Sequence, residues 1–167
     1  RHYAKEGQMP MNKRRKIWRT HKDRLFHRLF SEKENALSLY NALNGTNYGM
    51  EDGLKIVTLE DAIYLTMKND VAVCLCESIN LWEQQSSVNP NMPLRGLMYF
   101  SKEYEGWLSA NQKYIYGEKL VKIPAPKFYV LYNGEEQMPE REEYRLTDAF
   151  EHPSPGYEWT AYMVNIN

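Results

Sequence analysis

The spacing of apolar residues predicts a helix near the start of the chain. Thr20 and Asp23 are three residues apart and fit a capping box, in which two side chains satisfy exposed backbone N–H groups. Four apolar residues then follow at the spacing of one helix face: Leu25, Phe26, Leu29 and Phe30. We therefore expect the ordered part of the chain to begin near Thr20.

A second helix is predicted directly after the first. Ser31 and Glu34 repeat the capping-box spacing. The apolar positions that follow share one helical face: Ala36, Leu37, Tyr40 and Leu43. The helix is expected to end at Asn44 and Gly45, because glycine readily takes the left-handed conformation that terminates helices.

The next part of the chain favours strands. Residues 55–67 are rich in Ile, Val, Leu, Thr and Tyr, which favours a strand. Two residues in that range could instead cap a helix: Thr58 and Asp61. Residues 70–76 and 81–86 both have an extended pattern, and residues 77–80 resemble a turn. This combination predicts a hairpin with an acidic residue on each arm.

A long helix is expected after the hairpin. Pro90 and Pro93 bracket a loop. The apolar residues beyond it recur at helical spacing over about four turns. They are Leu94, Leu97, Met98, Phe100, Tyr104, Trp107 and Leu108, and the helix is expected to end near Asn111.

The C-terminal part predicts two more strands. Residues 127–132 form an apolar run that ends at an Asn-Gly pair, which is typical of a buried strand. Residues 135–143 are acidic and predict a solvated loop, and residues 159–166 again alternate as a strand does. Because the chain begins without Met and stops on a strand, we expect it to be part of a longer protein, truncated at its C-terminus.

The order of elements predicts a mixed α/β or α+β fold, in which helices flank a central mixed β-sheet. A chain of 167 residues with 43% hydrophobic residues is long enough to bury one core, so a single domain is expected over residues 20–167. Three aromatic residues are predicted to be core residues: Tyr64, Trp82 and Tyr99. Trp107 is a further candidate for the core.

Charge divides the chain into two unequal parts. Residues 1–28 contain ten Lys and Arg against two acids, whereas the remainder contains 11 basic and 20 acidic residues. We interpret residues 1–19 as a basic arm that binds the phosphates of a polyanion. The candidate phosphate-binding residues of this arm are Lys13, Arg14, Arg15, Lys16 and Arg19. A solvated tail without a partner explains the charge equally well.

Composition excludes several classes of protein. No stretch approaches the ~20 consecutive apolar residues of a membrane span, and no signal peptide is evident, so we expect a soluble, intracellular protein. Cys74 and Cys76, the 2 cysteines, are two residues apart on a predicted strand, where a disulfide between them is geometrically awkward. They are predicted to be buried thiols, and the 4 histidines lack the paired spacing of a zinc site.

The hairpin carries the residues with the clearest chemistry. Asp70 and Glu83 lie on adjoining predicted strands, where two carboxylates can share one Mg²⁺. Glu83 and Gln85 are two residues apart and so project from one face, whereas the Gln84 side chain points to the other and its backbone carbonyl can act as a third ligand. Gln85 can orient an attacking water but lacks the charge of a lysine. Taken alone, this spacing is more often that of surface acids on a hairpin.

Five segments, taken in order, carry a more specific signal. They are residues 21–30 (HKDRLFHRLF), 68–71 (KNDV), 81–87 (LWEQQSS), 89–96 (NPNMPLRG) and 128–134 (FYVLYNG). Over roughly residues 21–167 the chain resembles the PD-(D/E)XK nuclease family transposases, also called recombination-promoting nucleases. The combination of Glu83-x-Gln85-Ser-Ser with the downstream Met-Pro-x-Arg95 is fairly specific for that family.

The resemblance implies a restriction-endonuclease-like core and Mg²⁺-dependent DNA cleavage with little sequence preference, in a bacterial cytoplasm and linked to mobile DNA or defence. Mn²⁺ is expected to substitute for Mg²⁺.

Family members usually have His where this chain has Gln84, and a glutamine at position 85 is typical of them. Asp23 matches a possible auxiliary metal ligand, although a capping role explains it as well. Arg95 could contact a phosphate or a site carboxylate, or be a plain surface residue.

Three functions are consistent with these observations. The first is a DNA endonuclease that uses Asp70, Glu83, Gln84 and Gln85, and that could act as a homodimer. The second is a catalytically weak DNA-binding or toxin-like module that retains the fold, supported by the glutamine in place of lysine. The third is a strand-transferring transposase, which the sequence favours least because no separate site-specific DNA-binding domain is evident.

Overall fold

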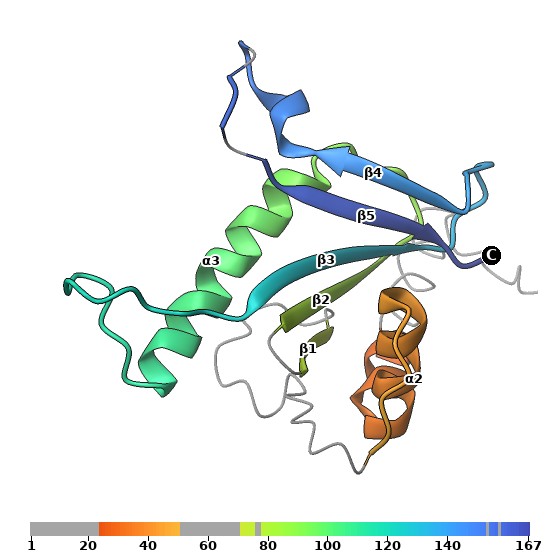
Figure 1. Cartoon of the computed structure of the whole chain (residues 1–167). Helices are drawn as coiled ribbons and strands as arrows, with labels where there is room; N and C mark the ends of the chain where they lie inside the picture. The colour runs from red at the N-terminus through yellow and green to blue at the C-terminus, as the bar shows by residue number, and fades with distance from the viewer. Residues whose placement is uncertain (1–23, 51–70, 76–77, 153, 157) are drawn as a thin grey trace, which may run out of the picture.

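A five-stranded mixed sheet with helices on both faces forms the centre of the molecule (Figure 1). The computed structural model describes residues 24–50, 71–75, 78–152, 154–156 and 158–167. The strands are β1 (Val71–Leu75), β2 (Ser78–Gln85), β3 (Ala125–Tyr132), β4 (Arg141–Arg145) and β5 (Thr160–Asn165). The main helices are α2 (Lys33–Asn44) and α3 (Met92–Ala110), and a short 3₁₀ helix, η1, spans Leu146–Ala149.

The strand order is β1-β2-β3-β5-β4. β1 is antiparallel to β2, the pairs β2–β3 and β3–β5 are parallel, and β4 is antiparallel to β5. Parallel neighbours require a long crossover, and α3 supplies the one between β2 and β3. The predicted mixed α/β fold with helices around a central sheet is confirmed.

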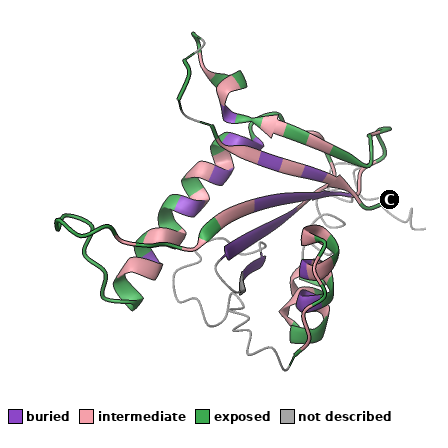
Figure 2. Ribbon diagram, viewed as in Figure 1, coloured by how far each residue is buried: buried purple, intermediate pink, exposed green. Residues whose placement is uncertain are grey.

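Each face of the sheet packs against its own helix. Trp82, Tyr129 and Leu131 face α2. Their neighbours in the same strands, Leu81 and Val130, face α3. The inner strands β2 and β3 are buried along most of their length (Figure 2). Strands covered on both sides have continuous apolar runs, which is why the sequence identified residues 127–132 as a buried strand.

The helix end at Asn44 is confirmed, but the predicted helix starts are less accurate. Gly45 follows α2 with φ 65°, and its N–H donates to the Asn41 carbonyl. The capping box at Ser31 is wrong, because residues 24–31 are themselves helical and the Ser31 hydroxyl donates to the His27 carbonyl at 2.7 Å. α2 begins one residue after Glu32, which makes no side-chain cap.

The apolar stripe predicted for the first helix is only half buried. Phe26 is buried and its ring lies 4.9 Å from that of Phe30, which in turn packs edge-on against Trp82. Leu25 and Leu29 are 66% and 47% exposed. Fewer residues of this helix therefore contact the sheet than the spacing of its apolar residues predicted.

A polar network joins the end of α2 to the sheet. The Tyr40 hydroxyl bonds Ser78 Oγ at 3.0 Å, and Asn44 Nδ2 donates to Asn80 Oδ1 at 3.1 Å. Lys127 Nζ and the Tyr129 hydroxyl both donate to Asn44 Oδ1, at 2.6 and 3.2 Å. These bonds allow polar residues to be buried in β2, since a buried polar group is costly only when it lacks a partner.

Two predicted loops are in part strands. Residues 78–80 were expected in a turn, but Ser78 and Asn80 are buried in β2 opposite β1. Arg141, Glu142 and Glu143 were expected in an acidic loop, but they form β4 at the sheet edge. Charged side chains suit an edge strand, because they protect its open side from pairing with other chains.

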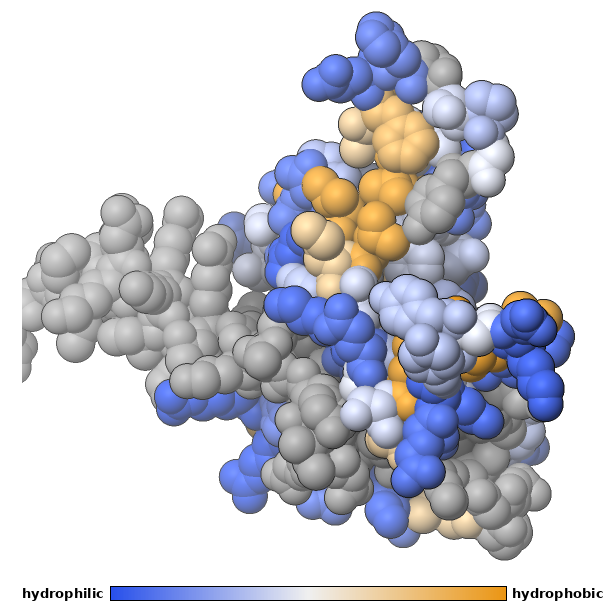
Figure 3. All heavy atoms as spheres, turned by 90° about the vertical axis from the view of Figure 1, so that its left-hand side faces the viewer, coloured by the Kyte–Doolittle hydropathy of each residue, from blue (hydrophilic) through white to orange (hydrophobic). Residues whose placement is uncertain are grey.

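The long helix α3 begins earlier than predicted. Met92 and Pro93 form its first turn and are buried, so Pro93 lies within the helix rather than in a loop. Leu94 and Met98 are 45% and 61% exposed, contrary to the predicted stripe. Figure 3, which looks onto the side of the molecule bearing α3, shows a strip of apolar surface. Gly96 is buried and lies directly against β3.

Several predictions concern residues outside the described ranges. These are the strand at residues 55–67 with Tyr64, the capping box at Thr20, the basic arm and Cys76. The side chain of Cys74 also lies outside them. Within the described residues, no helix combines the length and apolar character that a membrane span requires.

Two glycine substitutions test the packing of α3 on β3. A Cβ at Gly96 would overlap the Phe128 ring and lie 3.0 Å from Trp159 Nε1, whereas one at Gly117 would meet only Tyr114 at ordinary distances. We expect Gly96→Ala to lower the free energy of unfolding by about 1–3 kcal/mol, although alanine favours helices. Gly117→Ala is expected to change it by less than about 0.5 kcal/mol. Urea unfolding measures both, and equal stability of the two variants would contradict this packing.

Candidate functional site

Glu83 is a buried carboxylate near the C-terminal end of β2. It pairs with Val130 of β3, and its side chain lies on the face of the sheet that packs against α3. Only 3% of the residue is exposed. An ionised carboxylate buried to this extent requires charge-assisted hydrogen bonds, because burial otherwise disfavours its charged form.

Arg95 supplies one of these bonds. Its Nη2 lies 2.5 Å from Glu83 Oε1. The guanidinium is also held from within α3, since Nε donates to the Tyr99 hydroxyl at 2.8 Å and the Tyr99 ring lies 5.5 Å away. Tyr99 in turn packs edge-on against Phe128 of β3. Arg95 is therefore fixed between the sheet and its own helix, with 36% of its side chain exposed.

The turn before α3 brings Arg95 over Glu83. Asn89 organises this turn, because its carbonyl accepts from the Met92 N–H at 3.3 Å and its Oδ1 from the Asn91 N–H at 3.0 Å. Pro93 stands in the first turn of the helix, where its fixed φ is favourable. α3 consequently starts beside the end of β2, and its first turn faces the carboxylate.

Gln85 is the second donor to Glu83. Its Nε2 donates to Glu83 Oε1, the same oxygen that Arg95 contacts. The two residues lie on one face of β2, as their spacing predicted, because side chains two apart in a strand project together. Because Nε2 is the donor in this bond, the amide oxygen of Gln85 points the other way, where it can accept a hydrogen bond.

Gln84 faces the opposite way. It pairs with Leu131, which packs on the α2 side, and its Oε1 is buried without a hydrogen bond to the described residues. The Asn133 N–H donates to the Gln85 carbonyl, so that carbonyl points towards β3. Successive carbonyls of a strand point to opposite sides, so the Gln84 carbonyl points towards the β1 side of β2. The last described pair of β1 and β2 is Val71 with Trp82, and Gln84 lies beyond it.

The remaining predicted site residues are not described. Asp70 and Asp23 fall outside the described ranges, as do the arm residues Lys13, Arg14, Arg15, Lys16 and Arg19. Among the residues that are described, no three His, Cys, Asp or Glu side chains cluster as a metal site would. What is present is one carboxylate, one backbone carbonyl and one amide oxygen, which are the hard oxygen ligands that Mg²⁺ prefers.

Sequence reasoning anticipated one part of this arrangement and missed another. Arg95 was predicted to contact a phosphate or a site carboxylate, or to be a plain surface residue, and it contacts the Glu83 carboxylate. The role of Tyr99 in holding Arg95 was not foreseen, although a spacing of four residues on a helix is the available signal. The loop of residues 113–123 was not singled out.

No family model, curated protein or solved structure matches the chain.

Burial perturbs one carboxyl group of α3, that of Glu103. Glu103 lies two turns beyond Arg95, and desolvation raises its pKa from 4.5 to about 7. The folded protein then retains a proton that the unfolded chain releases between pH 4.5 and about 7. Stability conferred by this group is therefore lost as pH rises through that window.

We expect Glu103→Gln to flatten the fall in the free energy of unfolding between pH 5 and about 7 and to stabilise the protein above it, since glutamine carries no charge to desolvate. Glu105→Gln, at an exposed position on the same helix, is the matched control and should leave the pH profile unchanged. Urea unfolding across this pH range measures both variants. Identical profiles for Glu103→Gln and the unmodified chain would refute the perturbed pKa.

Replacing Arg95 tests the buried ion pair. Arg95→Ala leaves the Glu83 carboxylate without its cationic partner and is expected to lower the free energy of unfolding by about 2–4 kcal/mol. Arg145→Ala removes the partner of Glu143 in an exposed pair at 3.9 Å and should lower it by less than about 1 kcal/mol. Chemical denaturation compares the two. Equal losses would mean that Arg95 contributes no more than a surface arginine.

Proposed function

We propose that the chain is a Mg²⁺-dependent DNA endonuclease with a restriction-endonuclease-like core and little sequence preference. The observation that supports this most strongly is the Glu83 carboxylate, which is buried at the end of β2 and contacted by both Gln85 and Arg95. A carboxylate with an amide and a guanidinium beside it combines a metal ligand, a group that can orient water and a group that can bind phosphate.

The proposed metal ligands are Asp70, Glu83 and the Gln84 carbonyl. Val71 is paired with Trp82, so Asp70 and Glu83 are the chain neighbours of a paired position on antiparallel strands. If this pairing extends by one residue, Asp70 would lie opposite Glu83, and the side chains of directly opposite residues are close enough to share a cation. The Gln84 carbonyl points to the β1 side of β2. When bound, Mg²⁺ would lower the pKa of a ligand water and neutralise charge on the phosphate, and Mn²⁺ would substitute for it.

The surrounding side chains would orient the reactants. The Gln85 amide is held by its bond to Glu83, so its oxygen can accept a hydrogen bond from the attacking water and aim the water at phosphorus. Arg95 is partly exposed and can extend one N–H towards a phosphate oxygen while another remains on Glu83. Attack breaks the phosphorus–oxygen ester bond of the strand and leaves a phosphate and a hydroxyl end.

Regions outside the described residues would complete the protein. The basic arm would bind DNA phosphates without reading bases, so that affinity falls steeply with salt. An auxiliary ligand role for Asp23, a homodimer that cuts both strands and a bacterial cytoplasmic location stay predictions from the sequence and its resemblance to the recombination-promoting nucleases.

A catalytically weak DNA-binding module is the second candidate. One observation favours it: Arg95 already supplies a positive charge to Glu83, so the acid has a structural role without any metal. Gln85 also lacks the charge that a lysine would supply. A strand-transferring transposase is the third candidate, and no observation on the described residues favours it.

Plasmid nicking separates these candidates. We expect the chain to nick supercoiled plasmid with Mg²⁺ or Mn²⁺ and to lose this activity with EDTA. Asp70→Ala and Glu83→Ala should reduce cutting to background, and Gln85→Ala should slow it by about 10–100-fold, because positioning groups around a metal typically contribute that much. Gel electrophoresis of the plasmid measures the rates.

Gln84→Ala is the matched control for Gln85→Ala. Its side chain faces α2 and only its backbone carbonyl is proposed as a ligand, so cutting should continue at nearly the normal rate. Undiminished cutting by both acid variants would eliminate the proposed site. DNA binding without cutting in the unmodified chain would favour the second candidate, and joined DNA products would favour the third.

A further inference from the structure

The loop between α3 and β3 exposes an unusual amount of apolar surface. Residues 111–120 are all exposed, and the loop extends beyond the end of α3 (Figure 1). Tyr114 is 70% exposed, Tyr116 82% and Leu120 80%. The two tyrosine rings lie 5.6 Å apart, edge to face. Apolar groups concentrated in this way on a surface usually mark a site that binds a partner.

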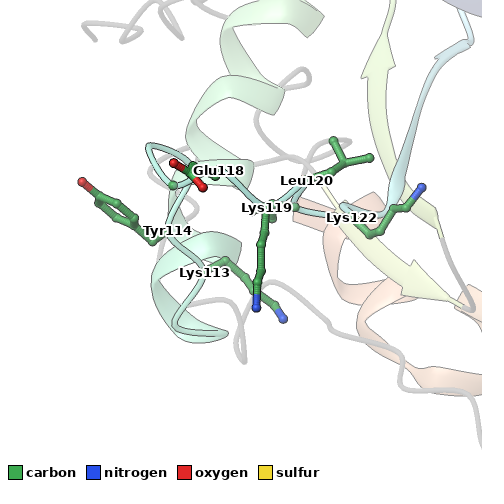
Figure 4. A pocket seen from close by; sticks show the side chains of 8 residues that line it. Lys113, Tyr114, Glu118, Lys119, Leu120 and Lys122 are labelled. Atoms are coloured by element: carbon green, nitrogen blue, oxygen red, sulfur yellow. The ribbon is translucent and has the colours of Figure 1, made fainter.

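The charge of the loop distinguishes it from the rest of the domain. Residues 113–123 contain three lysines and one acid, whereas residues 29–167 as a whole contain 11 basic and 20 acidic residues. Residues of the loop line a hollow of about 670 Å³, among them Lys113, Tyr114, Glu118, Lys119, Leu120 and Lys122. The side chains of Lys113 and Lys119 project in the same direction (Figure 4). The loop is thus a small positive region on an acidic body.

We propose that residues 113–123 bind a single strand of nucleic acid. Exposed tyrosine rings are stacking platforms for bases, and every base offers a face for such stacking once it is unpaired. Neighbouring lysines can neutralise the phosphates that link those bases. A duplex would satisfy the lysines but not the rings, because its bases are already stacked on one another.

This inference deepens the proposed function, on which it rests for the choice of nucleic acid over other polyanions. α3 links the candidate site to the loop, since Arg95 lies in its first turns and the loop follows its last residue. A helix of 19 residues spans roughly 28 Å, the length of about eight nucleotides in B-form DNA. A strand cut beside Glu83 can therefore reach the loop, which would favour unpaired DNA as substrate.

Binding measurements in EDTA test the loop without cutting. We expect the full chain to bind a labelled oligothymidylate of about 20 nucleotides more tightly than a duplex of equal length. Tyr114→Ala combined with Tyr116→Ala should weaken single-strand binding by about 10–100-fold. The matched control, Tyr114→Phe with Tyr116→Phe, keeps both rings and should bind normally. Fluorescence anisotropy measures the affinities.

The lysines are tested by the salt dependence of the same affinity. Replacing Lys113, Lys119 and Lys122 with glutamine should reduce the slope of log affinity against log salt by about 2, since each phosphate contact on a single strand contributes about 0.7. All variants change exposed residues, so their thermal unfolding temperatures should match that of the unmodified chain.

Three outcomes would overturn the inference. The first is unchanged single-strand affinity in the tyrosine-to-alanine variant. The second is an equal loss of affinity for single strand and duplex. The third is a tyrosine-to-alanine variant that binds DNA normally but changes its oligomeric state, as measured by light scattering. That result would assign the loop to contact with a second copy of the chain. If the chain binds strands through the loop but never nicks plasmid, the proposed function fails while the loop assignment stands.

Discussion

The parallel pairing of β2 with β3 determines where α3, the candidate site and the loop of residues 113–123 lie. A chain that leaves the C-terminal end of one strand must cross the sheet to begin a parallel neighbour, and here α3 makes that crossing. Its start is consequently beside Glu83, and its end opens into residues 113–123. The acidic site and the basic, aromatic loop are the two ends of one connection, which gives them a fixed separation along the same helix.

Burial of Glu83 makes the hydrogen-bond donors around its carboxylate necessary. A carboxylate that is 3% exposed is stabilised in its ionised form by the N–H groups of Arg95 and Gln85, both of which converge on one oxygen. Arg95 is held in turn by Tyr99, which packs on β3. These contacts join the first turns of α3 to the end of β2, and a carboxylate held in place by its neighbours suits either a metal site or a buried ion pair.

Local chemistry in the sequence determined much of the fold. The apolar run at residues 127–132 specified a buried strand, and Gly45 specified the end of α2 because few other residues adopt its positive φ. The alternation of Glu83, Gln84 and Gln85 between two faces also followed from the sequence, since side chains in any strand alternate. Such features depend only on neighbouring residues, so one sequence is enough to predict them.

Contacts between distant residues decided the rest. Ser78 and Asn80 suggested a turn, yet α2 supplies the hydrogen-bond partners that allow them in a buried strand. The exposure of Leu94 shows that apolar spacing does not reveal which side of a helix meets the sheet. The partner of Arg95 was equally open until α3 packed on β3 and brought it to Glu83. Partners separated along the chain are selected by packing, and the spacing of nearby residues does not specify which distant residue the partner is.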